Sequence, residues 1–418
     1  MSFRHAAATL AMVAVAASGI LVAAPAHADN IRDGEYWLSQ YGITDAWKTT
    51  KGKGITIAVI DTGVDGTHPD LEGAVSGGTD FSGIGASDGQ QPVGTVESEH
   101  GTMVASLAAG RGSAPGVGVI GAAPEASILS ISIGFGEGNA DSDTQVAEAV
   151  TWAVDHGANV INMSLTRNTL SWPESWDKAF LYAEEHNVVV VAAAGNRGSG
   201  TASVGAPATM PGVLTVAGVD KDGKASVDAS AQGITIGVAA PSEELLGAVP
   251  GGQTVIWNGT SGATPIVAGV VALVMAAHPD LDAANVINRI VKTATPAGAA
   301  GEDPIYGFGL LDADAAVDDT VKSVKANPMG DLAEWIRINR RASSTTEPTL
   351  PPTQTSTASP VVPEKAATPR NPLGAIYPTA AQLRNVGLPL GVVGLFVVAL
   401  GLMVAGAYRQ FRRVRGKE

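Results

Sequence analysis

The chain has 418 residues, a formal net charge of −14 and no cysteine. Its length allows one large domain with appended segments. The absence of cysteine excludes a thiol nucleophile, a disulfide framework and a cysteine-ligated metal. The acidic charge argues against nucleic-acid binding through a basic face.

The first 54 residues divide into two predicted segments. Residues 1–28 begin with Arg4 and His5, continue as an apolar alanine-rich run and end Ala26-His27-Ala28. This pattern predicts a signal peptide cleaved before Asp29, with an uncleaved N-terminal anchor as the alternative. Residues 29–54 follow as a short amphipathic N-terminal extension.

Short apolar runs and amphipathic runs alternate from residue 55 to residue 316. We expect strands at 55–61, 126–133, 160–165, 188–193, 213–219 and 234–239. We expect helices at 101–109, 144–156, 176–186, 261–278 and 281–293. This alternation predicts an α/β domain over 55–316, with a mainly parallel sheet and helices on both faces. Ligands of such sheets bind beyond the carboxyl ends of the strands.

The C-terminal part of the chain has the composition of a membrane tether. Residues 317–385 are rich in Pro, Thr and Ser and are predicted to be a linker, within which 331–341 is compatible with a short helix. Residues 386–408 are apolar, uncharged and long enough to span a bilayer. The basic tail 409–418 predicts a cytoplasmic C-terminus. We therefore expect a single-pass cell-membrane protein with an extracytoplasmic main domain. A buried core helix, the alternative, fits a terminal apolar run poorly.

The stretch from Asn258 to Pro265 contains a candidate nucleophile. Ser261 lies between small residues in Gly259-Thr260-Ser261-Gly262, at the expected start of an apolar helix. A serine there is commonly an N-cap, whose hydroxyl accepts from a free backbone N–H. It is also where a helix dipole and free N–H groups stabilise negative charge.

A nucleophilic serine needs a base and an acid that orients it. Asp61 ends an apolar strand, where a carboxylate needs a partner, although an Asx turn or a helix cap is the alternative. Three histidines lie at helix ends, where they complement the dipole: His156, His186 and His278. Of the other two beyond the signal peptide, His68 precedes a proline in a loop, whereas His100 begins a helix after a long polar loop. By elimination, His100 is the best candidate base.

Asn196 provides a candidate oxyanion donor. It follows Gly195 directly after a predicted core strand, and its amide can donate a hydrogen bond to a developing oxyanion. The alternative is an ordinary left-handed turn residue, since Gly-Asn is common in turns.

The order Asp, His, Asn, Ser and the surrounding motifs resemble the subtilisin-like serine peptidases of the S8 family. The matching runs are Asp61-Thr62-Gly63, His100-Gly101-Thr102, Val204-Gly205-Ala206-Pro207-Ala208, Gly259 to Pro265, and Gly307-Phe308-Gly309-Leu310-Leu311-Asp312. The resemblance implies that Ser261 attacks a peptide carbonyl, that His100 acts as base and that Asp61 orients it. It implies that Asn196 and the Ser261 backbone N–H hold the oxyanion.

The same resemblance implies where a peptide binds. It assigns the cleft walls to two runs: Ser164, Leu165 and Thr166, and Ala193, Ala194 and Gly195. Thr166 stands where the family commonly has glycine, which predicts restricted specificity. Members often bind calcium, and Asp70 matches one ligand position. The loop 114–118, which would complete that site, has no side-chain oxygen. We therefore expect no metal and no cofactor.

The whole arrangement resembles the mycosins, membrane-anchored peptidases of actinobacterial type VII secretion systems. A short aromatic N-terminal extension, a Pro-rich linker, one terminal membrane helix and a basic tail carry this resemblance. Mycosins commonly have disulfides, and this chain has no cysteine. The expected partners are a protein or peptide substrate, the membrane and a type VII secretion membrane complex, without nucleic acid. The alternative function is a non-catalytic component that stabilises a membrane secretion complex.

Overall fold

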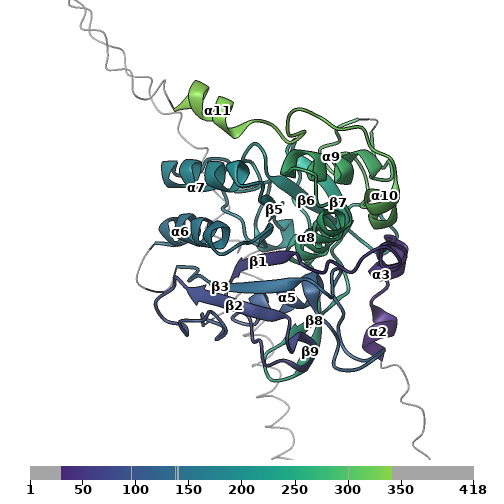
Figure 1. Cartoon of the computed structure of the whole chain (residues 1–418). Helices are drawn as coiled ribbons and strands as arrows, with labels where there is room; N and C mark the ends of the chain where they lie inside the picture. Colours follow the sequence, from purple (N-terminus) through teal and green to yellow (C-terminus); the bar gives the residue numbers. More distant parts are fainter. Residues whose placement is uncertain (1–29, 96, 137, 139–140, 300, 341–418) are drawn as a thin grey trace, which may run out of the picture. The chain divides into compact units, whose positions relative to one another are not determined.

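The computed structural model describes residues 30–95, 97–136, 138, 141–299 and 301–340 (Figure 1). The predicted signal peptide, the membrane helix 386–408, the basic tail and the linker beyond residue 340 lie outside the described residues. Within the described part of the chain, one helix, α8 (Thr260–Ala277), is apolar and long enough to cross a membrane. It is 83% buried, as expected for a helix in the core of a domain.

The domain is built on a sheet of seven parallel strands in the order β2-β3-β1-β4-β5-β6-β7. The strands are β1 (Thr56–Asp61), β2 (Val75–Asp80), β3 (Ser127–Ser132), β4 (Val160–Met163), β5 (Val189–Ala193), β6 (Leu214–Val219) and β7 (Ile236–Pro241). The expected α/β fold with a mainly parallel sheet is confirmed. Because successive strands are added on one side of β1 and then on the other, the carboxyl ends of β1, β3 and β4 flank the point where the winding reverses, which is where such sheets bind ligands.

Helices cover both faces of this sheet (Figure 1). On one face α5 (His100–Ala109) packs against α8, and α8 also contacts β1 and β4 to β7. On the other face α6 (Ser142–Asp155) packs against α7 (Glu174–Glu185). Two further helices, α9 (Ala283–Thr293) and α10 (Ala313–Asp318), pack near the end of α8. Both faces are therefore shielded from water, and most residues of the central strands are buried and apolar.

The folded domain is larger than the predicted range 55–316. The N-terminal extension forms three short helices, α2 (Asn30–Gly34), α3 (Trp37–Gln40) and α4 (Ile43–Ala46), and Trp37 and Ile43 are fully buried. At the other end α11 (Leu332–Asn339) packs on α7, with Arg340 2.7 Å from Asp177. The start of the predicted linker, 317–340, therefore belongs to the domain, because apolar residues such as Leu332 are buried against it.

The structure contains three strands that the sequence pattern did not predict. The strand β2 was missed because its sequence, Val-Ser-Gly-Gly-Thr-Asp, has only one large apolar residue. The other two, β8 (Leu245–Val249) and β9 (Gln253–Trp257), form an antiparallel hairpin. The hairpin leads directly into α8.

Candidate active site

Asp61 and His100 come together at the carboxyl end of β1. The His100 ring nitrogen Nδ1 lies 2.8 Å from Asp61 Oδ1 and 3.0 Å from Oδ2. Asp61 is fully buried, and the His100 side chain is 16% exposed. Because the carboxylate only accepts, Nδ1 carries the shared proton, which leaves Nε2 of the neutral ring as an acceptor.

Thr62 fixes the start of α5, on which His100 lies. Its hydroxyl donates to the Ser98 carbonyl at 2.8 Å and accepts the Gly101 N–H at 2.9 Å. Gly101 is needed here because a Cβ at this position would overlap the Gly63 carbonyl oxygen. Gly101 thus allows the start of α5 to approach the loop that follows β1.

Two opposing effects set the pKa of His100. Burial of the ring lowers its pKa by disfavouring the charged form. The Asp61 carboxylate raises it, through its charge and its hydrogen bond, and Glu97 and Glu99 add to this. Together the acidic groups outweigh burial, so the pKa of His100 lies above its ordinary value of 6.5.

Ser261 lies in the first turn of α8 and is not its N-cap. The N-cap position is occupied by Gly259, so no side chain caps this helix and the N-cap interpretation of Ser261 is wrong. Ser261 Oγ donates to the Ser164 carbonyl at 3.2 Å, and Ser164 Oγ donates to the Ser261 carbonyl at 2.8 Å. Pro265 explains the second bond: it lies in the second turn of α8 and has no N–H for the carbonyl four residues earlier. Ser164 therefore satisfies the carbonyl that Pro265 leaves open.

Asn196 is oriented by the start of the same helix. Its Oδ1 accepts from the Thr260 N–H at 2.8 Å and from the Thr260 hydroxyl at 2.9 Å. Its backbone is extended, with φ −118° and ψ 121°, so the alternative of a left-handed turn residue is wrong. A Cβ at Gly259 would lie 3.0 Å from Asn196 Nδ2. The amide nitrogen Nδ2 therefore lies beside the backbone that leads to Ser261. The amide oxygen Oδ1 is already occupied by the two hydrogen bonds from Thr260.

These residues line one cleft of about 420 Å³. Its walls include His100, Ser261, Asn196 and five of the six residues predicted for peptide binding, namely Ser164, Leu165, Thr166, Ala193 and Gly195. The sixth, Ala194, is fully buried, and its N–H donates to the Val216 carbonyl. The structure thus differs from the sequence expectation at Ala194, whose N–H is not free for a peptide.

Several cleft residues were not predicted from the sequence. They are Thr62, Val93, Gly94, Glu97, Phe135, Ser199, Thr201 and Thr260. Phe135 is 51% exposed at the cleft, three residues after the end of β3. Its position after a predicted strand was the signal that could have found it, since all strand ends of a parallel sheet meet at one edge.

The histidines away from the cleft have structural contacts. His156, His186 and His278 are the C-caps of α6, α7 and α8, as predicted. His68 is buried beside Asp70. Asp70 Oδ2 accepts the Val119 N–H at 2.9 Å, so this carboxylate holds the loop 111–119.

The chain is similar in sequence to known peptidases. The profile of the subtilase family matches residues 52–309. Fervidolysin from Fervidobacterium pennivorans is 36% identical over 315 residues, which cover 68% of this chain and 44% of that protein. Subtilisin E from Bacillus subtilis is 36% identical over 269 residues, covering 63% of this chain and 66% of that protein. The chain therefore matches less than two thirds of the length of either relative.

The fold is similar to that of a peptidase of known structure. MycP1 from Mycobacterium smegmatis superposes with a TM-score of 0.60 at 30% identity, covering 74% of this chain and 89% of that chain. A structure of MycP1 from the ESX-1 type VII secretion system gives the same TM-score and identity, with 71% and 88% covered. Another describes MycP1 as a serine protease and an essential component of that system.

Proposed function

This chain belongs to the subtilase family, and on that basis we propose that it is a serine endopeptidase whose triad is Asp61, His100 and Ser261. The observation that carries the proposal is the bond of 2.8 Å between His100 Nδ1 and the buried Asp61 carboxylate, on the cleft that Ser261 lines. In the neutral ring this bond keeps the proton on Nδ1 and leaves Nε2 free to accept, which is the tautomer that a general base requires.

The proposed reaction begins when a peptide enters the cleft and the Ser261 side chain turns from the Ser164 carbonyl toward His100. Ser261 Oγ attacks the peptide carbonyl carbon as its proton passes to His100 Nε2. The imidazolium then protonates the leaving amine, while Asp61 stabilises its charge. A water molecule, activated by His100, releases the acyl group from Ser261. Asn196 Nδ2 and the Ser261 backbone N–H donate to the oxyanion.

The cleft residues support restricted specificity. The Thr166 hydroxyl donates to the Arg167 carbonyl at 3.1 Å, and its Cγ2 lies 3.2 Å from where a Cβ on Gly195 would be. The methyl group therefore narrows the space between the two predicted walls. We propose that the cleft selects small side chains beside Thr166 and that most unfolded proteins are cut slowly.

A fluorophosphonate tests the nucleophile, because an activated serine displaces its fluoride and becomes phosphonylated. We expect a single label on the protein at Ser261, and none in Ser261→Ala. Ser76→Ala, at an exposed serine on β2, is the control and should label as the wild type does. Labelling that persists in Ser261→Ala would show that another residue is the nucleophile.

We propose that residues 1–28 are removed as a signal peptide and that 386–408 anchors the peptidase in the cell membrane. Protease added to intact cells should release a soluble domain by cutting within 342–385, and a tag at Glu418 should stay protected. Digestion of that tag in intact cells would contradict the orientation.

We also propose an association with a type VII secretion complex, which the similarity to MycP1 supports. Purification from detergent-solubilised membranes should recover membrane components of such a complex with the chain. Complementation of a deletion strain separates the two functions. If Ser261→Ala restores secretion and binding fully, the non-catalytic structural alternative is favoured over proteolysis.

A further inference from the structure

We propose that Trp257 is a positioning residue for His100, and that the β8–β9 hairpin keeps it in place through contacts with His68 and Ser106. This inference rests on the proposed function, since it concerns the geometry of the proposed base. It adds a part of the protein that the sequence motifs did not include. The hairpin lies immediately before Ser261 in the chain, yet its residue Trp257 contacts His100.

The indole of Trp257 contacts the elements that carry both the base and the nucleophile. Its ring meets the His100 ring edge-on, with centroids 5.7 Å apart and an interplanar angle of 80°. A Cβ at Gly262, next to Ser261, would lie 3.2 Å from Trp257 Cζ2. A Cβ at Gly247 would lie 2.7 Å from Trp257 Nε1. The two glycines thus make the space that the indole fills.

An edge-on contact of this kind restricts the His100 ring. The bond to Asp61 holds one nitrogen but leaves the ring able to tilt about that bond. A large rigid side chain against the ring removes this freedom, because side chains in a packed site cannot move without displacing their neighbours. Trp257 therefore limits where His100 Nε2 points, which decides whether it can reach Ser261.

Stability alone does not account for a tryptophan at this position. Trp257 Nε1 is buried and has no hydrogen-bond partner among the described residues. A buried unpaired N–H is unfavourable, and phenylalanine would avoid it while filling most of the same space. An indole that is retained despite this cost is consistent with a role in the site.

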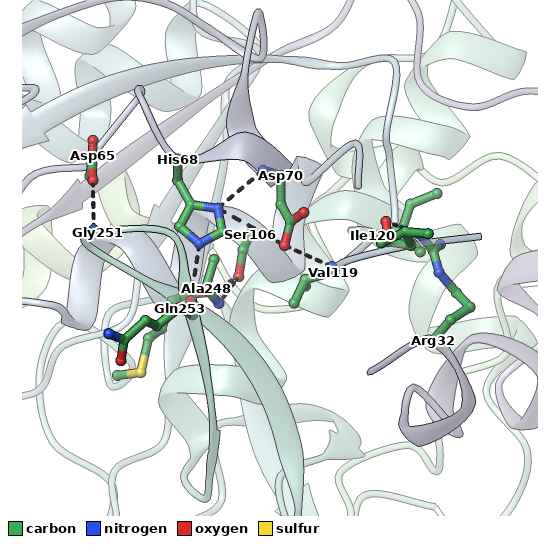
Figure 2. A network of polar contacts seen from close by, with 12 residues as sticks. Arg32, Asp65, His68, Asp70, Ser106, Val119, Ile120, Ala248, Gly251 and Gln253 are labelled. Atoms are coloured by element: carbon green, nitrogen blue, oxygen red, sulfur yellow. Dashed lines mark hydrogen bonds and ion pairs between the residues drawn. The ribbon is translucent and has the colours of Figure 1, made fainter. Parts of the chain in front are cut away.

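His68 holds the turn of the hairpin (Figure 2). Its Nδ1 accepts the Asp70 N–H at 3.1 Å, so the neutral ring carries its proton on Nε2. Nε2 then donates to the Gln253 carbonyl at 3.0 Å. Nearby, the Gly251 N–H donates to Asp65 at 3.3 Å. His68 is 3% exposed, so water does not compete for these bonds.

The helix α5 holds the hairpin at two points. The Ala248 N–H of β8 donates to Ser106 Oγ at 3.1 Å, and Trp257 of β9 packs on His100 (Figure 2 shows the first contact). Ser106 Oγ in turn donates to the Met103 carbonyl at 2.7 Å. The hairpin is thus aligned with the helix that carries the base, independently of its link to α8.

The rate of fluorophosphonate labelling tests the role of Trp257, because the reagent reports the reactivity of Ser261 without a peptide. We expect Trp257→Leu to slow labelling on the order of ten- to a hundredfold and to lower the melting temperature, because leucine leaves part of the space between the two glycines unfilled. Trp257→Phe keeps an aromatic edge and should recover most of the rate. Ile256→Ala is the matched control, on the same strand at a residue 70% exposed, and should label normally.

A second pair of variants tests the anchor. His68→Ala should slow labelling as Trp257→Leu does. His68→Gln, which can donate to Gln253, should recover part of the rate. In the wild type, NMR should show one sharp resonance for the proton between His100 and Asp61, broadened in Trp257→Leu.

The outcomes separate this inference from the proposed function. If the wild type is not labelled at Ser261, the proposed function fails. If the wild type is labelled and Trp257→Leu reacts equally fast with an unchanged NMR signal, only the positioning role is overturned. If the loss of rate in Trp257→Leu disappears once the rate is corrected for the fraction of protein unfolded at the assay temperature, Trp257 is a purely structural residue and the positioning role is also overturned.

Discussion

Replacement of Asn196 tests the proposed oxyanion site, and two variants divide its functions. Asn196→Ala removes the donor Nδ2 and the acceptor Oδ1 together. Loss of one oxyanion donor costs about 3–4 kcal/mol of transition-state stabilisation, which lowers kcat roughly a hundred- to a thousandfold. Because Thr260 is fully buried and donates twice to Oδ1, its N–H and hydroxyl lose their acceptor. Each such loss destabilises the fold by about 1–3 kcal/mol.

Asn196→Asp keeps the acceptor and removes only the donor. The carboxylate can still accept both hydrogen bonds from Thr260, and a negative charge at the start of α8 is favourable. We therefore expect near-normal stability in denaturant unfolding, with kcat lowered at least as much as in Asn196→Ala and KM little changed. Steady-state kinetics on a peptide substrate, together with the unfolding curves, provide the assay. If kcat of Asn196→Asp stays within about tenfold of wild type, Asn196 does not donate to the oxyanion.

Three further predictions follow from the same geometry. Only neutral His100 accepts a proton and its pKa is raised, so kcat/KM should fall as pH drops through a value above 6.5. Glu97→Gln should lower the pKa of His100 and so move this acidic limb of the pH profile to lower pH. A shift of the limb to higher pH would contradict the assignment. Thr62→Val should lower the free energy of unfolding by about 1–3 kcal/mol and also reduce labelling, because the Gly101 N–H loses its acceptor; normal values of both would refute this. Thr166→Gly should broaden a peptide-library profile and raise kcat/KM for bulky residues roughly ten- to a hundredfold without changing fluorophosphonate labelling, whereas an unmoved profile would place selectivity elsewhere.

Most of the sheet and its helices could be predicted from the sequence, because buried parallel strands are continuous apolar runs. The runs around Ile57 and Val190 are of this kind and form β1 and β5. The exceptions have identifiable causes. The strand β2 contains Gly78, where a Cβ would overlap backbone oxygens of Ser130 and Asp88. The residue type at this position is therefore determined by the close approach of neighbouring backbone and not by burial of an apolar side chain. No periodic pattern reports such an approach.

The positions of the site residues were predictable, but their hydrogen bonds were not. The ends of β1 and β5 put Asp61 and Asn196 at one edge of the sheet. The side-chain orientation depends on groups far away in the sequence, as when Ser164 satisfies the carbonyl of Ser261. That bond follows from the missing N–H of Pro265, but the sequence does not say which hydroxyl replaces it.

The residues that bring the site together are polar residues of the kind that form turns and caps. Thr62 joins β1 to α5, and Ser164 and Asn196 join the ends of β4 and β5 to the start of α8. Each bond ties a strand end to the helix that carries the base or the nucleophile. A substitution at any of these residues leaves a buried polar group without its partner, which lowers the free energy of unfolding. The same substitution displaces the helix that carries the base or the nucleophile, so stability and rate change together. Variants that keep the structural bond and remove only the reactive group are therefore the ones that can identify a catalytic role.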